Sequence, residues 1–99
     1  MASHWTFLTN HAQVLLVIAR NPSARMRDIA EAVGITERAT QRIVGDLVTE
    51  GYVARRRVGR RNEYVVNADA RLRHPLGRDH EVGEILDVLS EPGDAGVAA

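Results

Sequence analysis

The sequence predicts one small, mainly α-helical domain that carries a single β-hairpin. Two observations support this fold class. Apolar residues recur at three- and four-residue steps in four segments, and a fifth segment places branched and aromatic residues on both sides of a glycine turn. The chain has 99 residues, enough for one modest core. We expect residues 1–78 to form the main domain, residues 79–90 a helix for dimerisation, and residues 91–99 a disordered tail.

The composition excludes several classes of protein. There is no cysteine, which rules out disulfides and thiolate metal sites. The first ten residues lack the basic and apolar stretches of a signal peptide, and the longest apolar run, residues 14–19, is too short to cross a bilayer. We therefore expect a cytoplasmic protein that does not associate with membranes.

A net charge of zero conceals a separation of charge along the chain. Residues 20–62 contain ten arginines and five acidic residues, whereas residues 79–99 contain six acidic residues and no arginine. Five of the arginines fall within residues 55–61. Because local potential governs the encounter with a polyanion, such a chain can present a positive face despite its neutral total.

Three helices are predicted before the hairpin. Residues 8–22 form the first, with Thr9 or Asn10 as the N-cap, because a short side-chain oxygen can accept a bond from a free amide of the first turn. Residues 25–34 form the second, whose start is marked only by Ser23.

The third predicted helix spans residues 35–53, with Thr36 as its N-cap. One stripe of this helix has helical spacing and is expected to face the core: Thr40, Ile43, Val44, Leu47 and Val48. Its opposite face carries candidate DNA contacts: Thr36, Glu37, Arg38, Gln41 and Arg42. Arginine suits bidentate bonding to guanine, and glutamine to adenine. The alternative is that these residues are simply solvated.

The second and third helices have the spacing of a helix-turn-helix. Ala30 is small enough for the two helices to approach at their crossing, and Gly34 permits a sharp turn between them. Apolar residues at fixed positions would hold the second of the two helices with its far face exposed. They are Ile29, Val33, Ile35 and Ile43. Thr40 stands where such motifs usually have an aliphatic residue, and its methyl group can pack in the same way.

Residues 52–67 predict a β-hairpin that turns at Gly59. A hairpin directly after such a helix is a wing, and the arrangement is a winged helix-turn-helix. The residues best placed to reach the DNA backbone or minor groove lie at the tip of the wing: Arg60, Arg61 and Asn62. Arg57 is a further candidate contact. Arg55 and Arg57 share one face of the first strand and Arg56 lies on the other, so at least one of the three should face the domain. The alternative is an edge strand kept soluble by its charge.

Residues 8–67 resemble the MarR-like and ArsR-like winged-helix regulators in the order of their elements. More narrowly, "WTFLTNHA", "RDIAEAVGITERATQRIV", "VGRRNEY" and "LRHPL" together resemble small actinobacterial winged-helix transcriptional regulators. The resemblance implies sequence-specific binding of double-stranded DNA, with the recognition helix 36–50 in the major groove. The arginine-rich wing 52–67 would lie on the backbone or minor groove, and the bound protein would be associated with the nucleoid.

We expect a homodimer, because the final helix has one apolar stripe that must be buried and paired subunits suit pseudo-palindromic sites. Aromatic residues before the first helix would close the edge of the contact. The expected interface residues are Trp5, Phe7, Val82, Ile85, Leu86 and Leu89. The alternative is that the final helix folds back onto its own domain.

No metal, cofactor or catalytic activity is expected. Four histidines, at positions 4, 11, 74 and 80, are candidate ligands, and His80 lies one helical turn before Glu84. Acidic neighbours and the lack of cysteine favour a solvated face over a metal site. The chain lacks a nucleophile turn, any lysine and a glycine-rich phosphate loop.

Two functional alternatives stay open. One is a winged-helix interaction or adaptor module whose arginine-rich wing binds an acidic partner. The other is a regulator that senses a small-molecule effector, for which the chain after the wing offers few residues to form a pocket.

Overall fold

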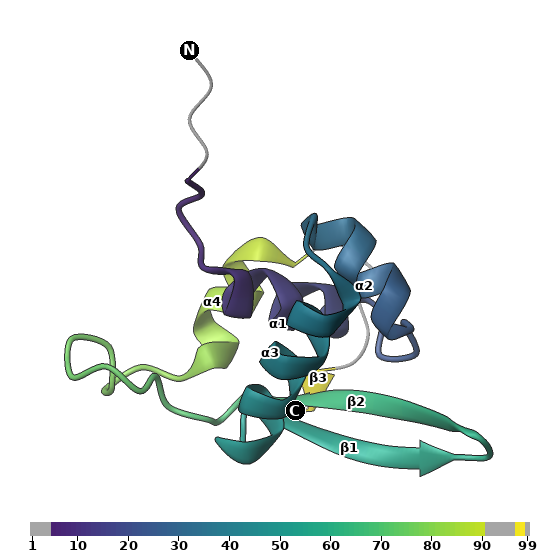
Figure 1. Ribbon diagram of the computed structural model, residues 1–99. Helices are drawn as coiled ribbons and strands as arrows, with labels where there is room; N and C mark the ends of the chain where they lie inside the picture. The colour runs from purple at the N-terminus through teal and green to yellow at the C-terminus, as the bar shows by residue number, and fades with distance from the viewer. Residues whose placement is uncertain (1–4, 91–96, 99) are drawn as a thin grey trace.

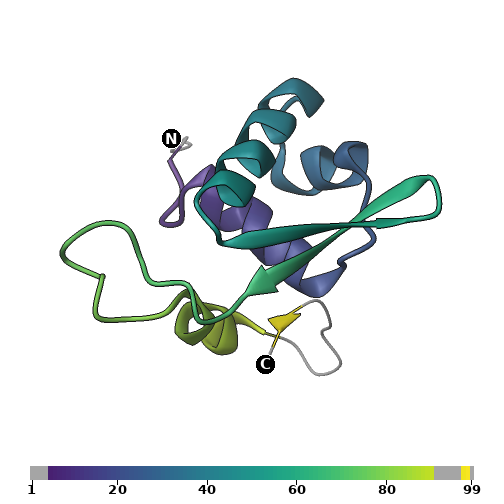
Figure 2. The same cartoon turned by 90° about the horizontal axis from the view of Figure 1, so that it is seen from below.

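The computed structural model describes residues 5–90 and 97–98, and within them four helices form a body from which a β-hairpin projects. In chain order the elements are α1 (Asn10–Arg20), α2 (Met26–Val33), α3 (Glu37–Thr49), β1 (Val53–Val58), β2 (Arg61–Asn67), α4 (Val82–Leu89) and β3 (Val97–Ala98). The hairpin and the segment 68–81 extend from opposite sides of the helical body (Figures 1 and 2). The predicted fold class, mainly α with a β-hairpin wing, is confirmed.

Two threonines begin α1 and α3 as predicted. The Thr9 hydroxyl accepts a hydrogen bond from the Ala12 amide at 3.2 Å, and the Thr36 hydroxyl accepts one from the Ala39 amide at 3.0 Å. Each satisfies an amide that the first helical turn would otherwise leave without a partner. Both caps use residues three apart in sequence, which is why the sequence alone reveals them.

The start of α2 differs from the prediction. Ser23 does not cap it; Arg25 is the N-cap residue, and the Asp28 carboxylate accepts a hydrogen bond from the Arg25 amide at 3.3 Å. The Ser23 hydroxyl instead donates to Glu63 of β2 at 2.9 Å. A carboxylate in the first turn also suits the positive end of the helix dipole.

The turn between α2 and α3 has the geometry that the helix-turn-helix requires. Gly34 ends α2 in the left-handed conformation, with φ of 86°, and the amides of Gly34 and Ile35 both donate to the Ala30 carbonyl. Thr40 is completely buried, and its hydroxyl donates to the Thr36 carbonyl at 2.9 Å. The hydroxyl is therefore satisfied within α3, and threonine replaces the usual aliphatic residue without an unpaired polar group.

The core forms where α1 meets α2, α3 and β2. Seven of its contributors come from outside the first three helices: Ala24, Tyr52, Val53, Tyr64, Val66, Val82 and Leu86. The most deeply buried aliphatic side chains, all at most 1% exposed, are Val14, Ile18, Ile29, Val44 and Val66. At roughly 1.5–3 kcal/mol for each aliphatic side chain removed from water, this contact is the main source of stability.

The wing is an antiparallel pair in which Val58 lies opposite Arg61, so its loop has two residues. Gly59 takes the first loop position with φ of 61°, the position that a type II′ turn reserves for glycine. At the base of the wing Tyr64 and Val66 are buried, and the Tyr64 amide donates to the Pro22 carbonyl at 3.1 Å. The wing is thus fixed to the loop between α1 and α2.

Backbone contacts fix α4 beside the segment that follows the wing. The Val82 amide donates to the Ala70 carbonyl at 2.8 Å, and the Gly83 amide donates to the Ala68 carbonyl at 2.9 Å. A Cβ atom at position 83 would lie 2.8 Å from the Ala68 carbonyl oxygen, closer than real Cβ contacts allow. Only glycine permits this approach.

Two of the six expected dimer contacts belong to the core of the chain itself. Val82 and Leu86 are 5% and 4% exposed and pack with the apolar cluster around α1, as in the alternative in which the final helix folds back. They lie four residues apart and so share one face of α4. The remaining four stay at the surface to different degrees: Trp5 and Phe7 are largely exposed, and Ile85 and Leu89 partly so.

The predicted disordered tail lies mostly outside the described residues, as do residues 1–4. Where it is described, the structure differs from the prediction: Val97 and Ala98 form β3, which pairs in parallel with Val66 and Asn67 of β2. The free edge of β2 offers the main-chain groups for this pairing. Within residues 5–90, no helix has the length and apolar character needed to cross a membrane.

The Thr36 cap yields a stability prediction. Thr36→Ala removes the acceptor for the Ala39 amide and should lower the free energy of unfolding by about 1 kcal/mol, measured by urea denaturation. Thr49→Ala is the matched control, since Thr49 is exposed at the end of α3; its effect should stay within about 0.5 kcal/mol. Equal losses in the two variants would contradict a capping role for Thr36.

Candidate nucleic-acid interface

The exposed face of α3 consists of the polar residues that the sequence places there. Burial of Thr40, Ile43, Val44 and Leu47 turns the opposite side of the helix outward. That side presents Glu37, Arg38, Gln41 and Arg42, all exposed. Among the described residues, none forms a hydrogen bond or ion pair with the side chains of Arg38, Gln41 or Arg42. These donors are available to an external acceptor, and a shallow hollow between them is lined by Thr36, Arg38, Ala39 and Arg42.

The arginines near the tip of the wing differ in whether their side chains already have a hydrogen-bond partner. Arg60 is exposed, and its side chain has no polar partner within residues 5–90. Arg57 donates through Nε to the Gly59 carbonyl at 3.0 Å, which fixes its side chain along the turn. Arg61 donates through Nη2 to the Ser23 carbonyl at 2.8 Å, across to the loop between α1 and α2. Of the three, Arg60 is the freest to reach an anion.

Glu63 holds the first strand of the wing and the α1–α2 loop together. Its carboxylate accepts hydrogen bonds from Arg56 Nη2 and from the Ser23 hydroxyl, both at 2.9 Å. The bond from Arg56, followed by that from Ser23, holds the pKa of Glu63 below its usual range. Arg56 is therefore engaged within the wing by the opposite strand, whereas Arg61 bonds directly to the α1–α2 loop. The guanidinium of Arg55 lies 5.7 Å from the centre of the Tyr64 ring.

Sequence reasoning missed Arg25, which the structure places beside the wing. A second hollow lies between the start of α2 and β2, and Arg25, Arg61 and Asn62 are among its lining residues. Arg25 is exposed and precedes the first turn of α2. Its position at the first residue of the predicted helix 25–34, within the basic stretch 20–62, is the signal that could have revealed it. The α3 residues and the wing residues line separate hollows.

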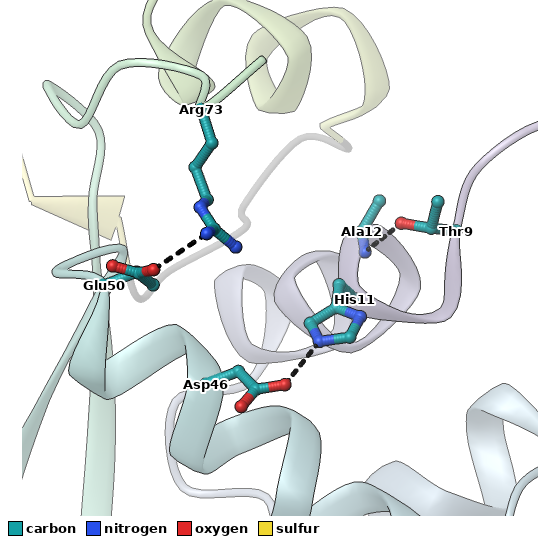
Figure 3. A network of polar contacts seen from close by, with 6 residues as sticks. All are labelled: Thr9, His11, Ala12, Asp46, Glu50 and Arg73. Carbon is teal, nitrogen blue, oxygen red and sulfur yellow. Dashed lines mark hydrogen bonds and ion pairs between the residues drawn. The ribbon is translucent and has the colours of Figure 1, made fainter.

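One histidine–aspartate hydrogen bond and one ion pair hold the C-terminal end of α3. His11 Nε2 of α1 lies 2.9 Å from Asp46 Oδ2, and Arg73 Nη2 of the segment 68–81 lies 3.0 Å from Glu50 Oε1 (Figure 3). All four side chains are largely exposed, so each pair contributes little to stability. Together they hold the C-terminal end of α3 between α1 and the segment 68–81.

The histidines do not assemble a metal site within the residues that the structure describes. His80 Nδ1 lies 2.9 Å from Glu84 Oε1, and this hydrogen bond raises the pKa of His80 and lowers the pKa of Glu84. His11 is engaged by Asp46, and His74 Nδ1 accepts from the Leu76 amide. His4 lies outside the described residues.

Comparison with known proteins agrees with this geometry. Residues 6–61, which extend from before α1 into the wing, match the family model described as the MarR family. The search of curated proteins found no match.

The Glu63 contacts predict a pH-dependent wing. Because the pKa of Glu63 is lower in the folded chain than its ordinary value of 4.5, the stability it contributes is complete above pH 4.5 and is lost as pH falls through the folded-state pKa. NMR titration should therefore show Glu63 and the Ser23 amide changing together below pH 4.5. In Glu63→Gln the Ser23 amide should not respond over that range. A Glu63 carboxyl that titrates at or above 4.5 would contradict the contacts.

Proposed function

The chain belongs to the MarR family and is a DNA-binding transcription regulator, and we propose that it reads DNA sequence with α3 and grips the backbone with its wing. The observation that carries this proposal is the polar face of α3, which lies opposite a buried stripe and has arginine and glutamine donors without partners in the described chain. Members of this family are regulators rather than enzymes.

We assign base contacts to the exposed face of α3. An α-helix fits the major groove, where each base pair presents a distinct pattern of donors and acceptors. Arg38 and Arg42 can bond guanine, and Gln41 can bond adenine, since their side chains are not engaged elsewhere in residues 5–90. Glu37 can accept from cytosine, and Thr36 lies at the end of the helix where it enters the groove.

We assign backbone or minor-groove contacts to the wing. Arg60 is the principal candidate because it is exposed and has no polar partner among the described residues, and Asn62 and Arg57 lie beside it on the two strands. Arg61 and Arg25 line one hollow, where an added phosphate would meet two guanidinium groups. Contacts of this kind fix the register of a protein on DNA without reading its sequence.

We further propose that the protein acts in the cytoplasm as a homodimer. Family members typically dimerise, and two recognition helices related by a two-fold axis match two half-sites of a pseudo-palindrome. The exposed apolar side chains Trp5, Phe7 and Ile85 support a second contact surface. No effector or cofactor is required by this proposal.

A shift assay separates this proposal from the adaptor alternative. At low salt the wild type should bind random double-stranded DNA, with an affinity that falls steeply as salt is raised, because binding releases counterions from the phosphates. No shift at any salt concentration would favour an acidic protein partner for the wing.

The wing assignment predicts a change in salt dependence. Arg60→Ala should weaken binding to all sequences alike and reduce the slope of log K against log salt by about one phosphate equivalent. Arg78→Ala changes the net charge equally but lies in the segment 68–81, on the side of the body away from the wing (Figure 1). The control should retain the wild-type slope. Equal slopes for wild type and Arg60→Ala would remove Arg60 from the interface.

The α3 assignment predicts a loss of specificity. With an operator selected from a random library by the wild type, Arg42→Ala and Gln41→Ala should each cost about 1–3 kcal/mol of operator binding. Binding to random DNA should change little, and Arg78→Ala should affect neither. Equal losses on operator and random DNA would show that these residues touch only the backbone.

A further inference from the structure

The segment before α1 places large aromatic side chains in solvent. Trp5 is 75% exposed and Phe7 is 92% exposed, although the core contains smaller apolar residues that are fully covered. The Thr6 hydroxyl donates to the Leu8 carbonyl at 2.6 Å, which fixes a short turn in this segment. The described part of the segment leads away from the helical body (Figure 1). We refer to residues 5–7 as the arm.

An apolar groove begins where the arm ends. It has a volume of about 420 Å³ and lies between α1, the C-terminal half of α3, the segment 68–81 and α4. Its walls are mostly apolar and include Leu16, Leu72, Ile85 and Leu89. Leu8 and Thr9 form the edge from which the arm departs.

The polar groups around the groove already have partners. His11 pairs with Asp46 and Arg73 pairs with Glu50, and the Thr9 hydroxyl accepts from the Ala12 amide (Figure 3). The groove therefore presents apolar surface together with polar groups that are already bonded to one another. Such a lining suits an uncharged aromatic occupant, because a charged ligand would leave its own charge unpaired on entry.

We propose that the groove of one copy binds the arm of a second copy, and that the exchange is reciprocal about a two-fold axis. This inference rests on the homodimer proposed above and states how the two copies hold each other. Trp5 and Phe7 of each subunit occupy the groove of the other. Ile85 and Leu89 then contact the partner's arm, not the partner's α4.

The local geometry favours a second copy over the chain's own arm. Thr9 caps α1 in extended conformation, and the bond from Thr6 to Leu8 directs the arm outward. To enter its own groove, the chain would have to reverse at Leu8 and lose the bond from Thr6 to the Leu8 carbonyl. Because the arm and the groove share one edge, a two-fold axis near Leu8 brings each arm to the other groove and closes the assembly.

The surface area that the exchange of arms would bury matches the area buried in stable dimers. An aromatic side chain buries roughly 150–250 Å², so four of them bury about 600–1,000 Å². The groove walls that they cover contribute a similar area, which gives about 1,200–2,000 Å² in total. This is the range of specific protein–protein interfaces, in which large aromatic residues carry most of the binding energy.

The first test uses the wild type, because Trp5 is the only tryptophan of the chain. At a concentration where sedimentation shows a dimer, its fluorescence should be blue-shifted and protected from a soluble quencher. On dilution to the monomer, the emission should move to the red. Three results would overturn the proposal: a monomer at high micromolar concentration, a dimer whose Trp5 stays exposed, or a buried Trp5 that does not respond to dilution. The last would indicate the chain's own arm or a bound small molecule in the groove, which native mass spectrometry separates.

The second test disables the arm in one variant and the groove in another. Trp5→Ala with Phe7→Ala should raise the dimer dissociation constant by about 100-fold or more. Ile85→Glu, which places a charge on the groove wall, should also produce monomers, with folding checked by circular dichroism. The control Leu76→Ala removes an apolar side chain that is 92% exposed and lies outside the groove, and it should remain dimeric.

Mixing the two defective proteins gives the decisive result. One copy retains an intact groove and the other an intact arm, so a mixture should form heterodimers in which one of the two contacts is restored. If the arms packed against each other, or if α4 paired with α4, mixing would restore nothing. Absence of heterodimers therefore overturns the exchange.

Failure of this inference is distinct from failure of the DNA-binding proposal. The fluorescence, sedimentation and mixing measurements contain no DNA. The arm variant should still bind random DNA with an affinity that falls as salt is raised, and it should lose affinity for a two-fold operator. A wild-type dimer that exchanges its arms but never binds DNA would instead contradict the proposed function.

Discussion

α3 buries one stripe of side chains against α1 and α2, and the position of the candidate interface depends on this contact. Thr40 and Val44 are completely covered, and Ile43 is nearly so. Successive residues of a helix are rotated by about 100° around its axis. Burial of this stripe therefore fixes how α3 is turned about its own axis. The polar residues on the other side of α3 must then face outward, because the helix geometry places them there. The hydrogen bond from Thr40 to Thr36 keeps the covered stripe free of unpaired polar groups.

The elements that the sequence predicts well are those set by local rules. The caps at Thr9 and Thr36 join residues three apart, and the spacing of apolar residues along α3 is enough to separate its buried face from its exposed face. The polar face of α3 is predictable for the same reason. The wing is different: Glu63 meets Ser23 from 40 residues away, and Arg61 meets it from 38. Spacing along the chain carries no information about such contacts, so the sequence could not show which wing arginines are engaged.

α4 shows a second limit of sequence reasoning. Its apolar stripe is correctly predicted, but periodicity shows only that a face is apolar and not what covers it. The structure divides the stripe: Val82 and Leu86 are buried in the chain's own core, while Ile85 stays partly exposed. All four residues of the stripe line the groove, but only Val82 and Leu86 also pack into the core cluster around α1. A helix can therefore serve the core of its own domain and a surface site at once.

The close approach at Gly83 has a consequence for how this sequence can vary. The amide of Gly83 bonds the carbonyl of Ala68, one residue after β2 ends, and no side chain fits between the two backbones. Any other residue at position 83 would push α4 away from the base of the wing. The exposed wing residues, by contrast, meet no such barrier. Substitution in this chain is thus open at the wing tip and on the exposed face of α3, and closed at a glycine that belongs to neither.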